Sequence, residues 1–474
     1  MSAILEKDEV IKWPQQSLPV IARAGVLVCG GGVAGVAAAT AAGRAEADVF
    51  LVERNAFLGG AATASGMGQW GVSSVGMSGL AVELLDRLVR AGGAFSGGSV
   101  IPIDPETFKD IACEMVTAAG ARILFYANIL DVVMEGNRVR GIVVQSKSGP
   151  KAILADVTID ATGDADVSFY AGVPCVKGRE SDGKMRPITL LFRLGNVDLE
   201  RVVHFVRDNP RDFVDNPDRN VIDLDRKLLR VMGYFSQVEA ARGRGELDPE
   251  CHYIRLEGVF VDRRIVIVNN TRVYGVDGTD PFDLTRAEFE GRKQMHQLIA
   301  FLRHHAPGFE LSLLVDSGPS LGVRETRRII GEYILTGEDI FSDRTFPDTV
   351  ARMYMRNVPG FKVHSPDAKE GSPEDTAHRT NVIPIHGYNF PFRSLLPQHV
   401  DNLLVAGRCV SVDHEADGWV RDQPHAILLG QAAGTAAAAA IGDGVAPRGV
   451  NVQQLQNSLR RQGVDLGEAV DRYR

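Results

Sequence analysis

The chain has 474 residues, 45% of them hydrophobic, and 60 acidic against 52 basic side chains give it a formal net charge of −8. An acidic chain without a basic stripe is a poor partner for nucleic acid, so we expect a small-molecule ligand instead. The charged start, and the glycines that interrupt the longest apolar run at about residues 24 to 42, predict a cytoplasmic protein without membrane insertion.

The five cysteines are scattered along the chain and form no C-x-x-C pair. This pattern carries no zinc or iron–sulfur signature, so we predict no metal site. An odd, unpaired set of cysteines also suits the reducing conditions of a cytoplasm.

Residues 1 to 22 are expected to form an N-terminal arm, and the segment after them has the pattern of a nucleotide-binding unit. A strand from Val26 leads into a glycine turn, a helix and a second strand that ends at Glu53. The turn matches G-x-G-x-x-G through Gly30, Gly32 and Gly35. In this motif the glycines turn the chain, make room for a pyrophosphate at the helix N-terminus and let helix and strand pack closely, while the acid binds the adenosine ribose. A plain glycine turn in an α/β core is the alternative, and the acid after the second strand favours the dinucleotide site.

Later segments indicate which dinucleotide binds. A diglycine follows the second strand, and nicotinamide domains do not need this glycine pair. Further along, an apolar strand ends in Ala161-Thr162-Gly163. A late strand ends at Gly407-Arg408, ahead of an Ala/Gly-rich helix. Together with the G-x-G-x-x-G unit, these three elements favour FAD. Its expected contacts are Gly30, Gly32, Gly35, Glu53, Arg54, Gly59, Gly60, Thr63, Gly163, Asp164, Arg408 and Gln431.

These motifs resemble those of the FAD-dependent oxidoreductase family, which is distantly related to fumarate reductase flavoproteins and to the flavin subunit of heterodisulfide reductase. The similarity runs from about Gly25 to Gly444 and includes residues 270–280 and 322–328. It implies an α/β fold, with a Rossmann-like FAD-binding domain of the glutathione reductase type and an inserted α+β substrate or cap domain. We expect the FAD-binding domain at residues 23–175 and 376–446, the inserted domain at 176–375, and a C-terminal helix and tail at 447–474.

Two departures from the related flavoproteins have consequences for the cofactor. No histidine follows Gly59-Gly60, so we expect FAD to be bound non-covalently rather than through a histidyl link. Many related folds have Gly-Asp near the flavin ribityl chain, where this chain has Gly407-Arg408. We therefore expect Arg408 to contact the pyrophosphate instead.

Three residues after the last predicted strand are candidates for catalysis. Histidine is the side chain best suited to proton transfer near neutral pH; His414 is the first candidate for this role, and His425 is the second. Arg421 has the planar guanidinium that suits a carboxylate or oxyanion. Pro424 suits the first turn of a helix, whose positive end would face the flavin pyrimidine. The alternative is that His414 fixes a loop and Arg421 pairs with Glu415.

Arg324, His386 and Arg393 are candidate substrate-binding residues. Arg324 belongs to an arginine-rich segment around Glu325 that can form either an anion pocket or a structural network of ion pairs. His386 and Arg393 lie in a segment that leads back to the flavin.

We predict that the protein is a dehydrogenase or reductase. It would transfer a hydride between FAD and a small organic substrate, in particular an anionic one. A flavin monooxygenase is one alternative, although the usual Gly-Asp signature of hydroxylases is missing. An electron-relay subunit of a larger redox complex is another, although the chain has no cysteine clusters of its own. The electron donor or acceptor and the oligomeric state stay open.

Overall fold

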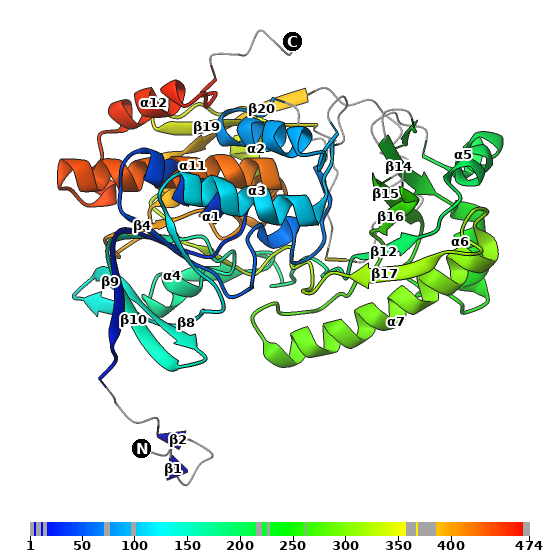
Figure 1. The fold of residues 1–474 in the computed structure, drawn as a ribbon, viewed down its shortest axis with the longest axis horizontal. Helices are drawn as coiled ribbons and strands as arrows, with labels where there is room; N and C mark the ends of the chain where they lie inside the picture. The colour runs from blue at the N-terminus through cyan, green and yellow to red at the C-terminus, as the bar shows by residue number, and fades with distance from the viewer. Residues whose placement is uncertain are drawn as a thin grey trace.

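The fold is described from a computed structural model, shown in Figure 1. It describes residues 4–5, 11–12, 17–70, 76–95, 101–214, 220–224, 228–260, 263–356, 366–367 and 385–467. Of the predicted N-terminal arm, this part includes a small hairpin of β1 (Ile4–Leu5) and β2 (Ile11–Lys12), and the start of the first long strand at Val20.

The predicted strand, turn, helix and second strand are all present. They are β3 (Val20–Cys29), α1 (Val33–Arg44) and β4 (Val49–Val52), and they belong to a seven-stranded sheet. Its other strands are β7 (Arg122–Leu124), β8 (Asn128–Glu135), β9 (Arg138–Ser146), β10 (Gly149–Asp160) and β21 (Leu403–Val405). The order is β7-β4-β3-β10-β9-β8, with β21 paired to β10; β7, β4, β3, β10 and β21 run parallel, and β8 and β9 form an antiparallel extension. Strand β21 thus joins a sheet built mainly from the first 160 residues.

Helices α1 and α11 (Gln423–Asp443) pack unusually closely because glycine and alanine line their contact. A Cβ atom on Gly430 would lie 2.0 Å from the carbonyl oxygen of Ala34, and one on Gly434 would lie 2.2 Å from that of Ala38. Among the described helices, α11 has the length and composition of a membrane span, but 78% of its apolar window is buried inside the protein. A buried core helix meets the same criteria, so this is weak evidence for a span.

Two further helices, α2 (Gly79–Arg90) and α3 (Pro105–Ala118), lie beside α1 and α11 (Figure 1). Asp104 caps α3 by accepting hydrogen bonds from the N–H groups of Glu106 and Thr107, and Pro105 occupies its first turn. The shorter elements nearby are β5 (Gln69–Trp70), β6 (Ile101–Pro102), α4 (Asp166–Tyr170), α8 (Gly337–Phe341), β19 (Thr349–Arg356), β20 (Ile385–Pro391), α10 (His414–Val420) and α12 (Val452–Arg461).

A second, antiparallel sheet has its own hydrophobic core. Its strand order is β13-β14-β15-β16-β12-β17. The strands are β12 (Phe192–Gly195), β13 (Val221–Asp223), β14 (Leu228–Gly233), β15 (Ile254–Phe260), β16 (Ile265–Val268) and β17 (Leu313–Ser317), and the helices of this unit are α5 (Leu199–Asp208), α6 (Phe235–Gly243) and α7 (Pro281–His305). Figure 1 shows this second unit, in green, beside the unit that contains the parallel sheet.

The boundary between the two units differs from the predicted one. The second core extends from Leu190 to Phe309, whereas Ile329, Leu335 and Ile340 already belong to the first core. The chain has therefore returned to the first unit well before residue 376. It returns through β18 (Arg327–Ile329), which pairs with the short strand β11 (Cys175–Lys177). Such short pairings have no recognisable sequence period, which is why the sequence pattern did not reveal the return.

Candidate functional site

The carboxyl ends of four parallel strands meet at one edge of the large sheet. Backbone hydrogen bonds join these ends: the N–H of Gly30 donates to Val52, that of Ala161 to Cys29, and that of Ala406 to Asp160, over 2.8–2.9 Å. Ligands of open α/β sheets bind at this edge. We call the residues that gather here, Gly30–Gly32, Glu53, Gly163, Asp164 and Arg408, the strand-end cradle.

The glycine turn leaves the N-terminus of α1 open. Gly30 has φ +98°, and a Cβ atom on it would lie 2.5 Å from the carbonyl oxygen of Ala161. A Cβ atom on Gly35 would lie 1.8 Å from the carbonyl oxygen of Gly30, so glycine is required for helix and strand to pack. Around Gly32, by contrast, no atom lies within 4 Å of that position, and no side chain caps the helix there. A helix N-terminus in this state attracts an anion, because its first N–H groups lack partners.

Glu53 lies beside this turn and is almost fully buried. Its Oε2 accepts a hydrogen bond of 2.6 Å from the N–H of Gly31, and its Oε1 accepts bonds of 2.7 and 2.8 Å from the side chain and backbone of Asn55. The carboxylate is thereby held at the end of β4. Its neighbour Arg54 is exposed.

The predicted diglycine packs against the turn. The N–H of Gly59 donates to the carbonyl of Gly31 over 2.8 Å, and a Cβ atom on Gly60 would lie 2.9 Å from the Cα of Gly32. Thr63 fixes this segment by donating from its hydroxyl to the carbonyl of Leu58. The diglycine and Thr63 therefore line and brace the cradle.

Arg408 contributes to the cradle a guanidinium group whose hydrogen-bond donors are only partly used. Its Nη2 donates to Asp164 Oδ1 over 2.6 Å and lies 3.1 Å from where a Cβ atom of Gly163 would be. Its Nη1 is buried and has no hydrogen-bond partner among the described residues. A buried guanidinium nitrogen without a partner suits a ligand oxygen.

The structure does not bring Gln431 to the cradle. Its Oε1 accepts a hydrogen bond from the N–H of Leu80 at the start of α2, and its Nε2 donates to Gln462. Gly430 faces α1, so the next residue of the helix points to a different side, towards α2. Gln431 joins three helices and does not contact the expected cofactor site.

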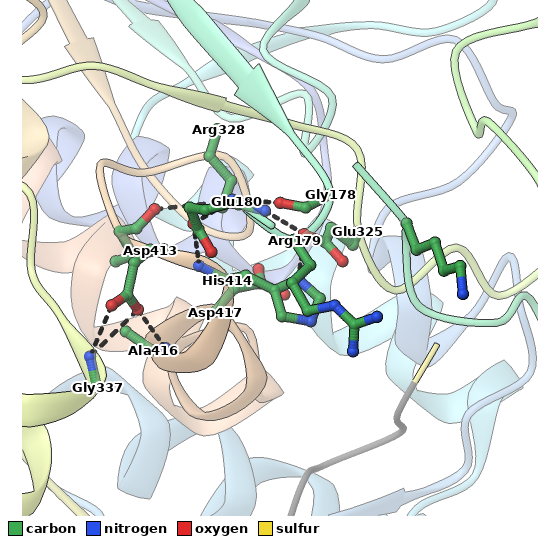
Figure 2. A network of polar contacts seen from close by, with 12 residues as sticks. Gly178, Arg179, Glu180, Glu325, Arg328, Gly337, Asp413, His414, Ala416 and Asp417 are labelled. Atoms are coloured by element: carbon green, nitrogen blue, oxygen red, sulfur yellow. Dashed lines mark hydrogen bonds and ion pairs between the residues drawn. The ribbon is translucent and has the colours of Figure 1, made fainter. Parts of the chain in front are cut away.

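Next to the cradle lies a buried network of charged residues, which we call the His414 network: Arg186, Glu325, Arg328, His414 and Asp417. His414 Nδ1 and Glu325 Oε1 are 2.9 Å apart, and Arg328 contacts the same Glu325 oxygen (Figure 2). Arg186 Nε donates to Asp417 over 3.1 Å and Arg328 Nε to the carbonyl of Val412 over 3.0 Å. Sequence reasoning missed Arg186 and Asp417, but one of its two alternatives for the arginine-rich segment around Glu325 was a structural network of ion pairs, which the contact between Arg328 and Glu325 matches.

Burial and charge act in opposite directions on the acids of this network. Burial by itself would raise the pKa of Glu325, but the hydrogen bond to His414 and the charge of Arg328 outweigh it and lower the pKa. For Asp417, burial comes first and the nearby Glu325 adds to it, so its pKa is raised. Glu325 is therefore the carboxylate held ionised beside His414.

Arg421 lies close to this network and has a hydrogen-bond donor that is not used. Its Nε is buried and lacks a hydrogen-bond partner among the described residues, and burial lowers the pKa of its guanidinium. The alternative pairing with Glu415 is not found in the described part of the chain; the Glu415 carboxylate instead lies against Gly337 of α8. Arg324 is also buried and donates to the carbonyl of Pro187.

The remaining candidates lie in other settings. His425 is buried, with Nε2 3.1 Å from the carbonyl oxygen of Tyr354 and Nδ1 3.0 Å from the Tyr388 hydroxyl; burial lowers its pKa. Arg393 is exposed and pairs with Asp348. His386 belongs to β20, but its side chain lies outside the described residues.

A family model described as FAD dependent oxidoreductase matches residues 25–459, and the chain belongs to that family. It is accordingly an enzyme that uses FAD. Thiamine thiazole synthase of Aeropyrum pernix is 30% identical over 152 residues, which cover 30% of this chain and 55% of that protein. The chain thus matches about half the length of this curated relative.

Several solved structures match more than nine tenths of the chain at low identity. A geranylgeranyl bacteriochlorophyll reductase-like protein of Thermoplasma acidophilum has a TM-score of 0.45 at 14% identity, covering 93% of this chain and 83% of that one. The myxobacterial chondrochloren halogenase has a TM-score of 0.48 at 13% identity, covering 93% and 79%. For p-nitrophenol 4-monooxygenase of Pseudomonas putida these values are 0.47 and 10%, covering 94% and 84%.

The cradle fits FAD on three observations. Gly32 leaves open space at an uncapped helix N-terminus, as a pyrophosphate needs. Arg408 offers a buried donor without a partner, and Glu53 offers its carboxylate at the end of the second strand. Among the described residues, no three His, Cys, Asp or Glu side chains are grouped so as to hold a metal ion.

Proposed function

We propose that the enzyme transfers a hydride between non-covalently bound FAD and a small anionic organic substrate. In this proposal the unit with the parallel sheet is a FAD-binding domain of the glutathione reductase type, and the second unit is the inserted substrate or cap domain. FAD, when bound, supplies the two-electron chemistry, and the protein orients the substrate and moves a proton.

The observation that carries the proposal is that the His414 network adjoins the cradle through one segment, residues 325–328. From this segment, Thr326 donates to Asp164 Oδ1 over 2.8 Å and Arg327 donates to the Asp164 carbonyl over 3.1 Å. The preceding residue, Glu325, holds His414. A titratable histidine is therefore tied to the same short segment as the cofactor cradle.

In this arrangement His414 has one nitrogen available for chemistry. Its Nδ1–H donates to the ionised Glu325, which sets the tautomer and leaves Nε2 to accept or release a proton. No partner for Nε2 is present among the described residues. Arg421, with its buried and unfilled Nε, would bind a carboxylate or oxyanion of the substrate.

Two other functions are separated from this one by simple measurements. A flavin monooxygenase would need a reduced nicotinamide and oxygen to convert its substrate, and the product would gain an oxygen atom. An electron-relay subunit would be reduced by a partner protein and by none of the small substrates. Hydride transfer alone predicts that a small substrate changes the redox state of the flavin, by bleaching the oxidised form or reoxidising the reduced form, in the absence of both oxygen and nicotinamide.

The direct test is an anaerobic screen of small organic acids for bleaching of the oxidised flavin and for reoxidation of the reduced flavin, followed by identification of the product. We expect at least one acid to change the redox state of the flavin, with one equivalent of product per flavin. Reduction by NAD(P)H alone, followed by oxygen insertion into a substrate, would replace the proposal with the monooxygenase.

His414 and His425 form a matched pair for the same assay. His414→Ala should slow flavin reduction by about 10²–10⁴ with normal FAD content, because a general acid or base is lost. His425→Ala should mainly lower the melting temperature, because both ring nitrogens of His425 serve buried hydrogen bonds. Wild-type reduction rates in His414→Ala would remove this residue from the proposed chemistry.

A further inference from the structure

The second sheet has one apolar face and a second face on which charged residues lie among apolar ones, and both are buried. Alternate residues of β14, β15 and β16, such as Val231, Leu256 and Val268, belong to the hydrophobic core of the second unit. The residues between them point the other way. On that side lie Arg230, Arg255 and Glu257 of the strands and Asn269, the residue after β16, which together we call the polar face.

The polar face is closed to solvent. Glu257 is 0% exposed and Asn269 1%, and the Arg255 side chain is 13% exposed. Arg230 lies directly opposite Glu257 across β14 and β15 and is also buried. Charged groups are rarely buried without a specific function or a full set of partners.

Several atoms of this face lack hydrogen-bond partners among the described residues. Glu257 Oε1 is 2.5 Å from Arg255 Nη2, but Glu257 Oε2 has no partner, and neither has Arg255 Nε. Asn269 Nδ2 makes only long contacts, of 3.5 Å to Glu257 and 4.0 Å to the sulfur of Met67, and its Oδ1 has none. Each such atom is costly to bury, so a ligand that fills several of them together would bind there favourably.

The first unit contributes one more residue to the same place. Gln69 of β5 is 5% exposed, and both its Oε1 and its Nε2 are buried without a partner in the described chain. It is paired with Pro102 of β6, and β6 lies against β15. Nearby, Met67 packs on Leu191 and Ile267 of the polar side of the sheet. Gln69 therefore lies at the junction of the two units, on the strand pair that contacts β15.

We infer that the polar face and Gln69 bind a small organic acid that carries a hydrogen-bond donor beside its carboxylate. Arg255 Nε and Gln69 Nε2 are donors, which a carboxylate would accept. Glu257 Oε2, Asn269 Oδ1 and Gln69 Oε1 are acceptors, which need a hydroxyl or an ammonium group from the ligand. A ligand with only a carboxylate would leave Glu257 Oε2 without a hydrogen-bond donor. A ligand with only hydroxyl groups would leave Arg255 Nε without a carboxylate.

The site also connects to the start of α11, the helix whose N-terminal end we expect to face the flavin. Trp70, next to Gln69, donates from its indole N–H to Gln423 Oε1 over 2.9 Å, and Gln423 begins α11. The inference rests on the proposed function in that the acid bound here would be the substrate. Binding itself is measurable without turnover.

The first experiment is calorimetric titration of the FAD-loaded enzyme with four matched compounds: malate, aspartate, succinate and 1,2,4-butanetriol. Malate and aspartate offer a carboxylate with a neighbouring hydroxyl or ammonium, succinate lacks the donor, and the triol lacks the carboxylate. We expect malate or aspartate to bind at least about tenfold more tightly than succinate and the triol. Equal binding of all four, or no binding at millimolar concentration, would overturn the inference.

Two variants test which residue binds the donor group of the ligand and which binds its carboxylate. Glu257→Gln should weaken binding of the donor-bearing acid by about ten- to a hundredfold, the loss of one hydrogen bond to a charged group, and leave succinate unchanged. Arg255→Gln should weaken both acids. Because Arg255→Gln leaves Glu257 unpaired, the double variant Arg255→Gln, Glu257→Gln replaces the ion pair with two neutral amides and keeps the experiment interpretable if the single variant unfolds.

Arg193→Gln is the matched control, since Arg193 lies on the same side of the sheet but its Nε is occupied by Asp316 over 2.7 Å. It should bind the acids as the wild type does. If an acid binds as expected but neither reduces the oxidised flavin nor reoxidises the reduced flavin, the proposed hydride transfer fails and this inference stands. If a substrate reduces the flavin and neither Glu257→Gln nor Arg255→Gln changes its binding, the inference fails and the proposed function stands.

Discussion

Glu53 is the residue on which the adenosine end of the cofactor site depends most directly. Its carboxylate is held by Gly31 and Asn55 and has lone pairs left for ribose hydroxyls. Glu53→Ala removes charge-assisted hydrogen bonds worth about 1.5–3 kcal/mol each. We expect FAD affinity to fall at least about tenfold with the fold intact.

Fluorescence titration of the apoprotein with FAD measures this change, and circular dichroism checks the fold. Asn55→Ala is the control, because it keeps the carboxylate and removes only one group that orients it. A dissociation constant unchanged by Glu53→Ala would mean that another residue binds the ribose.

Asp166, at the start of α4 beside the cradle, makes the free energy of unfolding depend on pH. Burial, and then the neighbouring carboxylates of Asp164 and Asp160, raise the pKa of Asp166 to about 6, although Arg327 and Arg54 oppose the shift. The unfolded chain releases this proton near pH 4. The folded state therefore binds the proton more tightly, and the free energy of unfolding should fall as pH rises from about 4 to about 6 and stay lowered above that range.

Asp166→Asn removes this penalty. We expect the variant to exceed the wild type in free energy of unfolding by about 1 kcal/mol at pH 8, and by nothing at pH 4, after allowing for solvent screening of a partly exposed group. Urea unfolding at both pH values measures the difference. The exposed Asp86→Asn is the control, and a larger gain at pH 4 than at pH 8 would reverse the sign of the argument.

At the scale of elements, two glycines at the start of α1 have different roles: Gly35 is needed for folding, and Gly32 leaves space for the cofactor. Gly35→Ala would place a methyl group 1.8 Å from the carbonyl oxygen of Gly30, so α1 must move, and we expect a loss of about 3 kcal/mol in stability. Gly32→Ala meets no atom within 4 Å and should cost less than about 1 kcal/mol. Its methyl group would nevertheless occupy the open space at the helix N-terminus.

Gly32→Ala should therefore fold normally and bind FAD at least about tenfold more weakly. Thermal unfolding of the apoproteins and FAD titration of each variant give the two quantities independently. Normal FAD affinity in Gly32→Ala would show that the cofactor does not approach this helix end.

For the whole molecule, the expected non-covalent cofactor links FAD concentration to stability. FAD at a hundred times its dissociation constant should raise the free energy of unfolding by about 2.7 kcal/mol, because it binds only the folded state. The melting temperature should rise with added FAD, and heat or acid denaturation should release FAD into the supernatant. Flavin that stays on the precipitated chain would contradict non-covalent binding.

Much of the cofactor site was predictable from sequence because it is local. Gly30, Gly32 and Gly35 lie within one turn, and Glu53 follows at the end of the next strand, so spacing along the chain reflects spacing in the fold. The family of the protein and its use of FAD followed from such motifs. The turn geometry at Gly30 and Gly35 agrees with their predicted roles in packing.

The tertiary structure decided what depends on helix phase and on distant contacts. Gln431 is one residue beyond a glycine that faces α1, and this step of the helix turns it to α2. His414 and Glu325 are 89 positions apart, and nothing in either segment alone predicts their hydrogen bond. The alternation of Ile254-Arg255-Leu256-Glu257 is visible in the sequence, but only the packing of two units against each other buries its polar side. Local motifs therefore specified the cofactor class, whereas long-range packing decided which charged groups are buried together.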